Sequence, residues 1–328
     1  MFEKRSGQSS RTLKLGGCFW LLAASGVAGC AVQAPPKAPS LRVVPVVAPP
    51  SATRSPTPTP TPTPIANEPG RVCGELGCLA FASAPAAFQR VLLEQPRVLG
   101  LGEAHAPKGF PGVRSSTRRF AEELMPALKG QATDIVIELL LGGGRCGQER
   151  ESAVAARQKP VTQHQAENNQ NEFVTLGHAA RALGIQPHAL LPTCPEFQAV
   201  LDAGETDIAR MLELIADTTL RTVDKLLSAP NANSSKLILV YGGALHNDLS
   251  PSDASRAWSY GPRLMQRTEG RYVALDVIVP EFIKDTPAWR ALPWYAHYNA
   301  DRLGHDAILF NPEPHSYVLV LPLSPGTP

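Results

Sequence analysis

The chain has 328 residues, of which 31 are Lys or Arg and 29 are Asp or Glu, and its formal net charge is +2. Residues 1–29 hold four of the basic residues and one of the acidic ones, so residues 30–328 carry 27 basic and 28 acidic residues. This balance, without a basic cluster, excludes a nucleic-acid-binding function, which requires a basic face. A small-molecule or peptide substrate stays open.

The first 29 residues have the pattern of an export signal. Basic residues precede a short apolar stretch from Leu15 to Ala28, which is shorter than the roughly 20 residues that span a bilayer. The segment Val27-Ala28-Gly29-Cys30 that follows resembles the lipobox of bacterial lipoproteins. The resemblance implies removal of residues 1–29 and a diacylglycerol and palmitate anchor on Cys30. We therefore expect a lipid-anchored protein of the cell envelope, and Ala31 after the cysteine indicates the outer membrane.

Residues 30–70 form a tether between that anchor and the rest of the chain. The alternating Thr-Pro run from Thr57 to Pro64 predicts an extended polyproline II spacer, because proline fixes φ and lacks a backbone donor. Residues 71–328 then make one domain, which is long enough to bury a single large core.

Four cysteines remain in this domain. An even number in an exported protein predicts disulfides, and four cysteines allow three pairings. We favour Cys73–Cys78, because a short local loop closes easily, together with Cys146–Cys194. Half a zinc site at Cys73 and Cys78 is disfavoured, because the chain has no second close pair of cysteines.

Apolar runs alternate with amphipathic segments along the domain. The runs are continuous, which is typical of strands that are buried on both faces of a parallel sheet. Interspersed helices then favour an α/β fold, a three-layer αβα sandwich with a mostly parallel central sheet. In chain order, we predict a strand over 97–102, a helix over 115–128, a strand over 134–140, a helix over 171–183, a strand over 185–191, a helix over 208–227, and strands over 236–241, 272–279 and 317–321.

Ionisable side chains close three of these strands. Gly102-Glu103-Ala104-His105 ends the first strand, and Gly243-Ala244-Leu245-His246 ends the strand over 236–241. Glu138 lies inside the apolar run of the second strand, where an unpaired carboxylate is costly. Because ligands of open α/β sheets bind at the carboxyl ends of the strands, we expect these groups to form one site.

Two imidazoles with one or two carboxylates suit a divalent metal such as Mn, Fe, Co or Zn. We predict His105, His246 and Glu138 as its ligands, and Glu103 and Glu138 as catalytic groups. Glu103 or Glu138 would serve as general base toward a metal-activated water. The alternative for each residue alone is a hydrogen-bonded or solvated loop side chain.

The segments Val98–His105, Ile135–Glu138 and Leu239–His246 resemble the erythromycin esterase/ChaN-like superfamily, which includes the Tiki proteins. The resemblance covers most of residues 90–320 and implies an αβα sandwich with a pocket near these residues. It implies lactone hydrolysis, metal-dependent proteolysis or haem binding. The esterases have one more residue between the glutamate and the histidine, and a glycine where this chain has Ala106.

Three functions therefore compete. The first is a metal-dependent hydrolase, the second a haem- or iron-binding lipoprotein without catalysis, and the third a catalytically silent binding domain. The haem-binding relatives use a tyrosine as haem ligand, and no tyrosine of this chain can be matched to it. His164 is assigned to a polar loop and His178 to a structural role in a helix. His297 and His305 flank the aromatic segment Trp289–Tyr298, which either lines a pocket or packs in the core, with core packing favoured. Asn247-Asp248 either orients His246 or forms an Asx turn.

Overall fold

The computed structural model describes residues 69–142, 144–162, 164–204, 208–230 and 235–324. The chain divides into two units, Met1–Pro60 and Thr61–Pro328, and the fold below belongs to the second. The predicted signal, Cys30 and nearly all of the tether lie outside the described residues. No helix in the described ranges has the length and hydropathy to cross a membrane.

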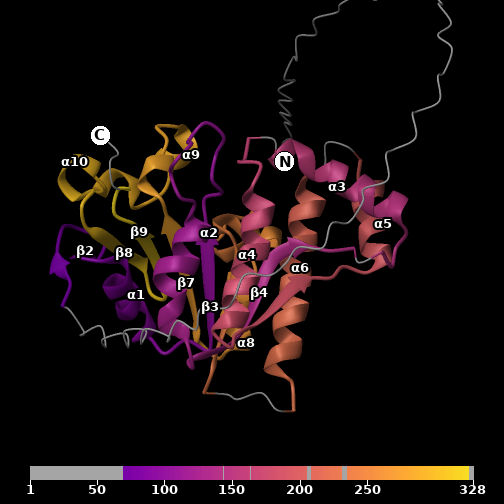
Figure 1. Cartoon of the computed structure of the whole chain (residues 1–328), viewed down its shortest axis with the longest axis horizontal. Helices are drawn as coiled ribbons and strands as arrows, with labels where there is room; N and C mark the ends of the chain where they lie inside the picture. The colour runs from indigo at the N-terminus through magenta and orange to yellow at the C-terminus, as the bar shows by residue number, and fades with distance from the viewer. Residues whose placement is uncertain (1–68, 143, 163, 205–207, 231–234, 325–328) are drawn as a thin grey trace, which may run out of the picture. The chain divides into compact units, whose positions relative to one another are not determined.

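A single sheet organises the described part of the chain, with nine strands in the order β1-β2-β8-β9-β7-β3-β6-β4-β5 (Figure 1). The six strands from β9 to β5 run parallel, and β8, β2 and β1 add antiparallel strands at one side. This arrangement confirms the predicted mostly parallel α/β fold. The strands are β1 Arg71–Val72, β2 Leu79–Phe81, β3 Val98–Glu103, β4 Ala132–Leu140, β5 Gln186–Leu190, β6 Leu237–Gly243, β7 Tyr272–Ile278, β8 Ala307–Glu313 and β9 Ser316–Val320.

Helices connect the strands and cover the sheet. The α-helices are α1 Ala84–Leu92, α2 Ser116–Arg119, α3 Gln148–Thr162, α4 Asn169–Ala182, α5 Cys194–Asp202, α6 Ile208–Leu227, α7 Ala244–Asn247, α8 Gly261–Arg267, α9 Pro287–Arg290 and α10 Ala300–Leu303. A π-helical turn η1 Phe120–Leu124 and a 3₁₀ turn η2 Met125–Leu128 continue α2, and further 3₁₀ turns are η3 Arg256–Trp258, η4 Pro280–Phe282 and η5 Tyr295–His297.

The core lies on both faces of the sheet, because successive strand residues point to opposite sides. Leu99 and Leu101 of β3 pack with α1, α4 and the turns η1 and η2. Val98, on the other side of the same strand, packs with α5, α6 and α8. Both layers of helices therefore bury apolar strand residues, which completes the three-layer sandwich.

Most predicted elements are confirmed within a few residues, and the helix over 208–227 matches α6 at both ends. The helices α1, α3, α5 and α8 and the strands β1, β2 and β8 were not predicted. The fifteen residues of α3 lack an apolar face, since seven charged or amide side chains are interspersed with small and apolar ones. A helix of this kind has no hydrophobic periodicity from which it could be predicted.

Both predicted disulfides are present. Cys73 and Cys78 close a local loop before β2, and Cys146 joins the loop after β4 to Cys194 at the start of α5. Their Cα atoms lie 5.2 Å apart in each pair, which is within the usual range for a disulfide.

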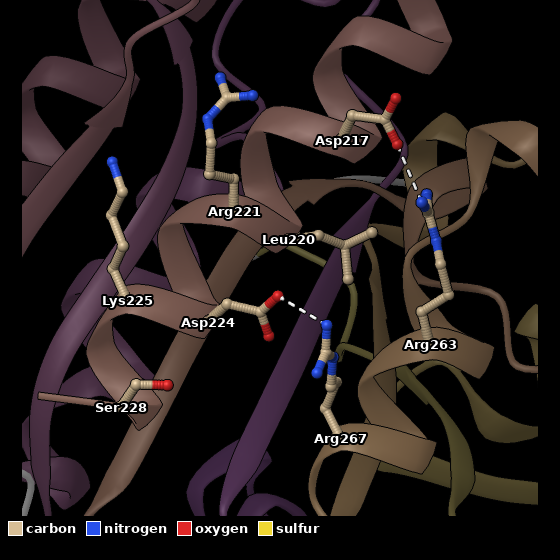
Figure 2. A pocket seen from close by; sticks show the side chains of 8 residues that line it. All are labelled: Asp217, Leu220, Arg221, Asp224, Lys225, Ser228, Arg263 and Arg267. Carbon is tan, nitrogen blue, oxygen red and sulfur yellow. Dashed lines mark hydrogen bonds and ion pairs between the residues drawn. The ribbon is translucent and has the colours of Figure 1, made fainter.

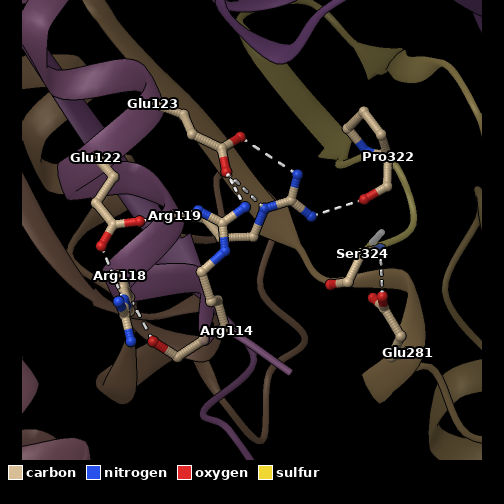
Figure 3. A network of polar contacts seen from close by, with 9 residues as sticks. Arg114, Arg118, Arg119, Glu122, Glu123, Glu281, Pro322 and Ser324 are labelled. Atoms are coloured by element: carbon tan, nitrogen blue, oxygen red, sulfur yellow. Dashed lines mark hydrogen bonds and ion pairs between the residues drawn. The ribbon is translucent and has the colours of Figure 1, made fainter. Parts of the chain in front are cut away.

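A buried cation joins α2 to the segment that follows β9 (Figure 3). The Arg119 side chain is only 5% exposed, contacts the Glu123 carboxylate at 3.1 Å and donates to the Pro322 carbonyl at 2.7 Å. Arg114 also contacts Glu123, at 2.9 Å. The network holds the loop after β3 and α2 against the segment that follows β9.

Candidate active site at the strand ends

The four predicted site residues come together at the carboxyl ends of adjacent strands. The strand β6 lies between β3 and β4, and Glu103 of β3 is in register with Gly243 of β6. All four side chains, Glu103, His105, Glu138 and His246, line one cavity of about 320 Å³. The sheet topology therefore brings Glu103 and His246, which are more than a hundred residues apart in the chain, to the same edge of the sheet.

Glu103 is held from three directions and lies behind His105. Its side chain is 2% exposed. Oε1 accepts a hydrogen bond from His105 Nδ1 at 2.8 Å, and Oε2 accepts from Thr117 Oγ1 at 2.6 Å and from the Tyr241 hydroxyl at 2.8 Å. Burial alone would raise the pKa of Glu103, but these hydrogen bonds and the charge of His105 lower it. Glu103 is thus an anion whose geometry suits it to orient His105.

His105 turns its second nitrogen toward the cavity. The Glu103 carboxylate fixes Nδ1, and Nε2 lies 3.3 Å from the point that a β-carbon at Gly243 would occupy. Burial alone would lower the pKa of His105, but the hydrogen bond and charge of Glu103, together with the charge of Glu138, raise it to about 9. At neutral pH, His105 is therefore an imidazolium with a donor that faces the cavity.

Glu138 depends on the glycine pair at the end of β6. Its Oε2 accepts a hydrogen bond from the backbone N–H of Gly243 at 2.7 Å. A β-carbon at Gly242 would lie 2.4 Å from the same oxygen, which is closer than two such atoms can approach. The two glycines thus make room for a carboxylate and an imidazole at once, which is a backbone reason for the Gly-Gly sequence.

His246 presents the opposite hydrogen-bonding character. Its Nδ1 lies 2.6 Å from the Trp258 carbonyl oxygen, which can only accept, so Nδ1 carries the proton. In the neutral ring, Nε2 is then an acceptor, and it lies 3.9 Å from Glu138 Oε1. The ring is buried and stacks on Tyr260 with centroids 6.4 Å apart. The neutral ring of His246 therefore presents an acceptor, and His105 presents a donor, beside the same carboxylate.

Among the described residues, no three His, Cys, Asp or Glu side chains are grouped closely enough, as placed, to hold a metal ion. Glu103 uses both oxygens on protein donors, and one oxygen of Glu138 is bound to a backbone N–H. The predicted metal ligands share the cavity, but their positions suit hydrogen bonding and proton transfer.

The remaining histidines take no part in this site. His178 is exposed on α4, His164 accepts a backbone hydrogen bond from Lys108 through its carbonyl, and neither His297 nor His305 lines the cavity. Trp294, in the aromatic segment beside His297, is buried against Phe310 in the core. Asp248 accepts from the backbone N–H of Ser250 at 2.8 Å, which is the predicted Asx turn.

Three groups that support the site were not predicted. The hydroxyls of Thr117 and Tyr241 hold Glu103, and the carbonyl of Trp258 sets the tautomer of His246. Tyr241 was weakly indicated by the sequence, because its hydroxyl is the only side-chain polar group of the strand β6. Thr117 follows a loop of a dozen residues, and a carbonyl has no side-chain signature.

A second hollow lies between α6 and α8 and shares no lining residue with the first (Figure 2). Its charged side chains largely neutralise one another. Arg263 contacts Asp217 at 2.9 Å, and Arg267 contacts Asp224 at 3.3 Å. Arg221 at the same hollow makes an ion pair with Glu196 at 2.6 Å. We assign no chemistry to this hollow.

The sequence matches no protein-family model and no characterised protein. Among solved structures, it is similar to the type III effector HopBA1, with 14% identity, coverage of 77% of this chain and 100% of that chain, and a TM-score of 0.37. It is also similar to ChaN of Campylobacter jejuni, described as binding haem cofacially, with 11% identity, coverage of 71% and 91%, and a TM-score of 0.35. A mutant of the erythromycin esterase EreC in its open conformation has 14% identity, coverage of 71% and 92%, and a TM-score of 0.38.

Proposed function

We propose that this protein is a hydrolase of uncharged esters, whose catalytic groups are His105, His246 and Glu138. One observation carries the proposal. The carboxylate of Glu103 keeps His105 a donor, the carbonyl of Trp258 places the proton of a neutral His246 ring on Nδ1 so that Nε2 accepts, and both rings line one cavity with Glu138. A donor imidazole and an acceptor imidazole in one cavity are an arrangement that suits general acid–base catalysis.

In the first step, His246 Nε2 and Glu138 take the proton of a water molecule as its oxygen attacks the ester carbonyl carbon. The distance of 3.9 Å between these two acceptors exceeds a hydrogen bond, so each keeps a lone pair for the attacking water. A carbon–oxygen bond forms while the carbonyl π pair moves to its oxygen. The His105 imidazolium donates to that developing oxyanion from a partly desolvated position.

In the second step, the tetrahedral intermediate collapses and its bond to the alcohol oxygen breaks. The leaving alkoxide takes the proton of His105 Nε2, and the products are a carboxylic acid and an alcohol. The proton held at His246 and Glu138 returns through solvent to His105, which restores the starting state. Glu103 touches no reacting atom in this scheme and is a positioning residue.

The test uses the full-length chain and a panel of neutral esters and lactones, with hydrolysis followed by titration of released acid. We expect turnover that falls about 10²- to 10⁴-fold in His246→Asn and in Glu138→Gln, the range for loss of a general base. The matched control is His178→Asn, on the exposed surface of α4. Hydrolysis no faster than in buffer, or full activity in both site variants, would overturn the proposal.

The metal-dependent form of this hydrolase, predicted with Mn, Fe, Co or Zn, stays a prediction that the same protein tests. Metal analysis of the purified chain and activity after chelation and after addition of each ion decide it. Haem binding rests on the resemblance alone, and haem titration with a search for a Soret band checks it. The third function, a silent binding domain, required the four side chains to lie apart, and their meeting in one cavity weighs against it.

We propose further that a lipid on Cys30 holds this domain at the cell envelope, in the outer membrane, through the residues 30–70 tether. The support is the sequence Val27-Ala28-Gly29-Cys30 at the end of the apolar stretch. The variant Cys30→Ala should move the chain from the membrane fraction to the soluble fraction of the envelope. Unchanged fractionation and no incorporation of labelled lipid in the natural chain would contradict it.

A further inference from the structure

The walls of the strand-end cavity differ sharply from its catalytic rim. The wall formed by α6 is apolar, with Met211, Leu212 and Ile215 at positions that lie on one face of a helix. Leu140 of β4 extends this apolar wall. The helices α3 and α4 contribute the uncharged amides of Gln158 and Gln170, and α4 also contributes the ring of Phe173.

The charges of the cavity exclude one class of substrate. No Lys or Arg is among the described residues that line it, and its ionisable side chains are two glutamates and two histidines. An anionic substrate would have to approach the Glu103 and Glu138 carboxylates without a compensating cation, apart from His105. The chain does place cations elsewhere, since Arg221, Arg263 and Arg267 surround the hollow of Figure 2. Their absence at the strand ends is therefore a property of this cavity.

The size of the cavity limits the substrate as well. Its volume of about 320 Å³ lies near the lower end of the range for small-molecule sites, which is roughly 300–1,000 Å³. A chain of a few methylenes against Met211 and Ile215 would fill the apolar wall. Met211 and Ile215 are 3% and 7% exposed, and the Leu212 side chain is only partly buried, so an acyl chain could cover it.

We propose that the substrate is a neutral ester of a short, unbranched apolar acid with an uncharged alcohol that forms hydrogen bonds. The acyl chain lies along α6 and the alcohol faces the amides of α3 and α4, while the ester carbonyl meets the catalytic rim. This inference rests on the proposed hydrolase function and adds its substrate class.

The experiment compares glycerol monoesters of acetic, butyric, hexanoic and decanoic acid, using the full-length chain. We expect kcat/KM to rise about fourfold for each added methylene, the ratio that corresponds to burial of one CH₂, until the wall is filled. The butyric ester of glycerol phosphate, an anion, should be hydrolysed at least tenfold more slowly than butyryl glycerol, because the cavity holds two carboxylates and no Lys or Arg among the described residues that line it. Equal rates on the acetyl and hexanoyl esters, or preference for the anionic ester, would overturn the substrate class.

Variants of the α6 wall test where the chain lies. In Leu212→Glu, a carboxylate would face the acyl chain, and the gain in kcat/KM per methylene should disappear. In Ile215→Ala, the best chain length should move to longer acids. The matched control is Leu93→Glu, at a position that is 57% exposed after α1, and it should keep the profile of the natural chain. Thermal unfolding of each variant shows that the fold is retained, and an unchanged chain-length profile in both folded α6 variants would overturn the placement.

Binding separates this inference from the proposed function. The 2-hydroxyethyl amides of the same acids resist hydrolysis, and their affinity is measured by calorimetry. If no ester is hydrolysed but affinity rises with chain length, the hydrolase proposal fails and the ligand class stands. If esters are hydrolysed without dependence on chain length, the ligand class fails and the hydrolase stands. If neither is seen, both fail.

Discussion

Gly242 lies so close to the Glu138 side chain that position 242 has no room for a side chain of its own: a β-carbon on Gly242 would lie 2.4 Å from Glu138 Oε2 and 3.0 Å from its Cβ. The Glu138 carboxylate can occupy its position only because residue 242 is glycine, although the φ of Gly242 is not one that favours glycine. A strand that ends in Gly-Gly provides both the missing side chain at 242 and the backbone N–H donor at 243.

Replacement of Gly242 by alanine should displace the Glu138 carboxylate from the cavity. We expect Gly242→Ala to lower turnover of a neutral ester about 10²-fold or more, as in loss of a general base, with a fold that remains intact. The control is Gly177→Ala in α4, where the new methyl group would make ordinary contacts at 3.6 Å. That change should leave turnover unaltered and stabilise the helix by up to about 1 kcal/mol. Equal turnover in both variants would remove Glu138 from the mechanism.

Replacement of Glu103 by glutamine should change His105 without touching the reacting atoms. The loss of the carboxylate charge removes the main cause that raises the pKa of His105, so the ring loses its proton at a lower pH. We expect kcat to fall about 10²- to 10⁴-fold with little change in KM, and the alkaline limb of the pH–rate profile to move to lower pH. A profile with the same limbs as the natural chain would show that Glu103 has only a structural role.

The stability of the fold should depend on His105 between neutral and alkaline pH. Its folded pKa of about 9 lies above the ordinary value of 6.5, so its contribution is fully present below about pH 6.5 and is lost as the pH rises through 9. Denaturant unfolding should therefore give a free energy about 2–3 kcal/mol lower at pH 9.5 than at pH 7, from roughly 1.4 kcal/mol per pKa unit. In His105→Asn this difference should vanish, and an equal loss in that variant would assign the effect to another group.

The two disulfides should contribute unequally. Their sequence separations are 48 residues for Cys146–Cys194 and 5 for Cys73–Cys78. Loop-closure entropy then predicts about 4 kcal/mol for the first and about 2 kcal/mol for the second. Urea unfolding of the two double Cys→Ser variants measures both values, and the opposite order would show that native contacts rather than chain entropy govern them.

The sequence predicted those site residues that lie at the ends of continuous apolar runs, because such runs can be recognised as buried strands. The strands β3 and β6 were recognisable, parallel strands present their ends at one rim, and His105 and His246 lie two and three residues beyond those strands. Glu138 was recognisable because a carboxylate interrupts the apolar part of β4.

The protonation states of the site were beyond the sequence, because they depend on groups that only tertiary structure brings near. Thr117 and Tyr241 reach Glu103 from another helix and another strand, and the acceptor for His246 is a backbone carbonyl. The prediction of metal ligands followed from residue types alone. The structure adds a hydrogen-bonding partner for Nδ1 of each imidazole, which orients the ring and leaves Nε2 toward the cavity.

The sheet order also determines when the site can form. The central strand β3 is completed by β6 and β7, and the Tyr241 hydroxyl that anchors Glu103 lies 138 residues further along the chain. Pairing of strands that are so far apart in the chain is slow, because the entropy of closing a long loop is lost before the new contacts stabilise the pair. A nascent or truncated chain that ends before β6 therefore has an exposed parallel edge and three of the four site residues, but lacks His246 and the Gly243 N–H that holds Glu138. The strand-end cavity is thus completed only when β6 has paired.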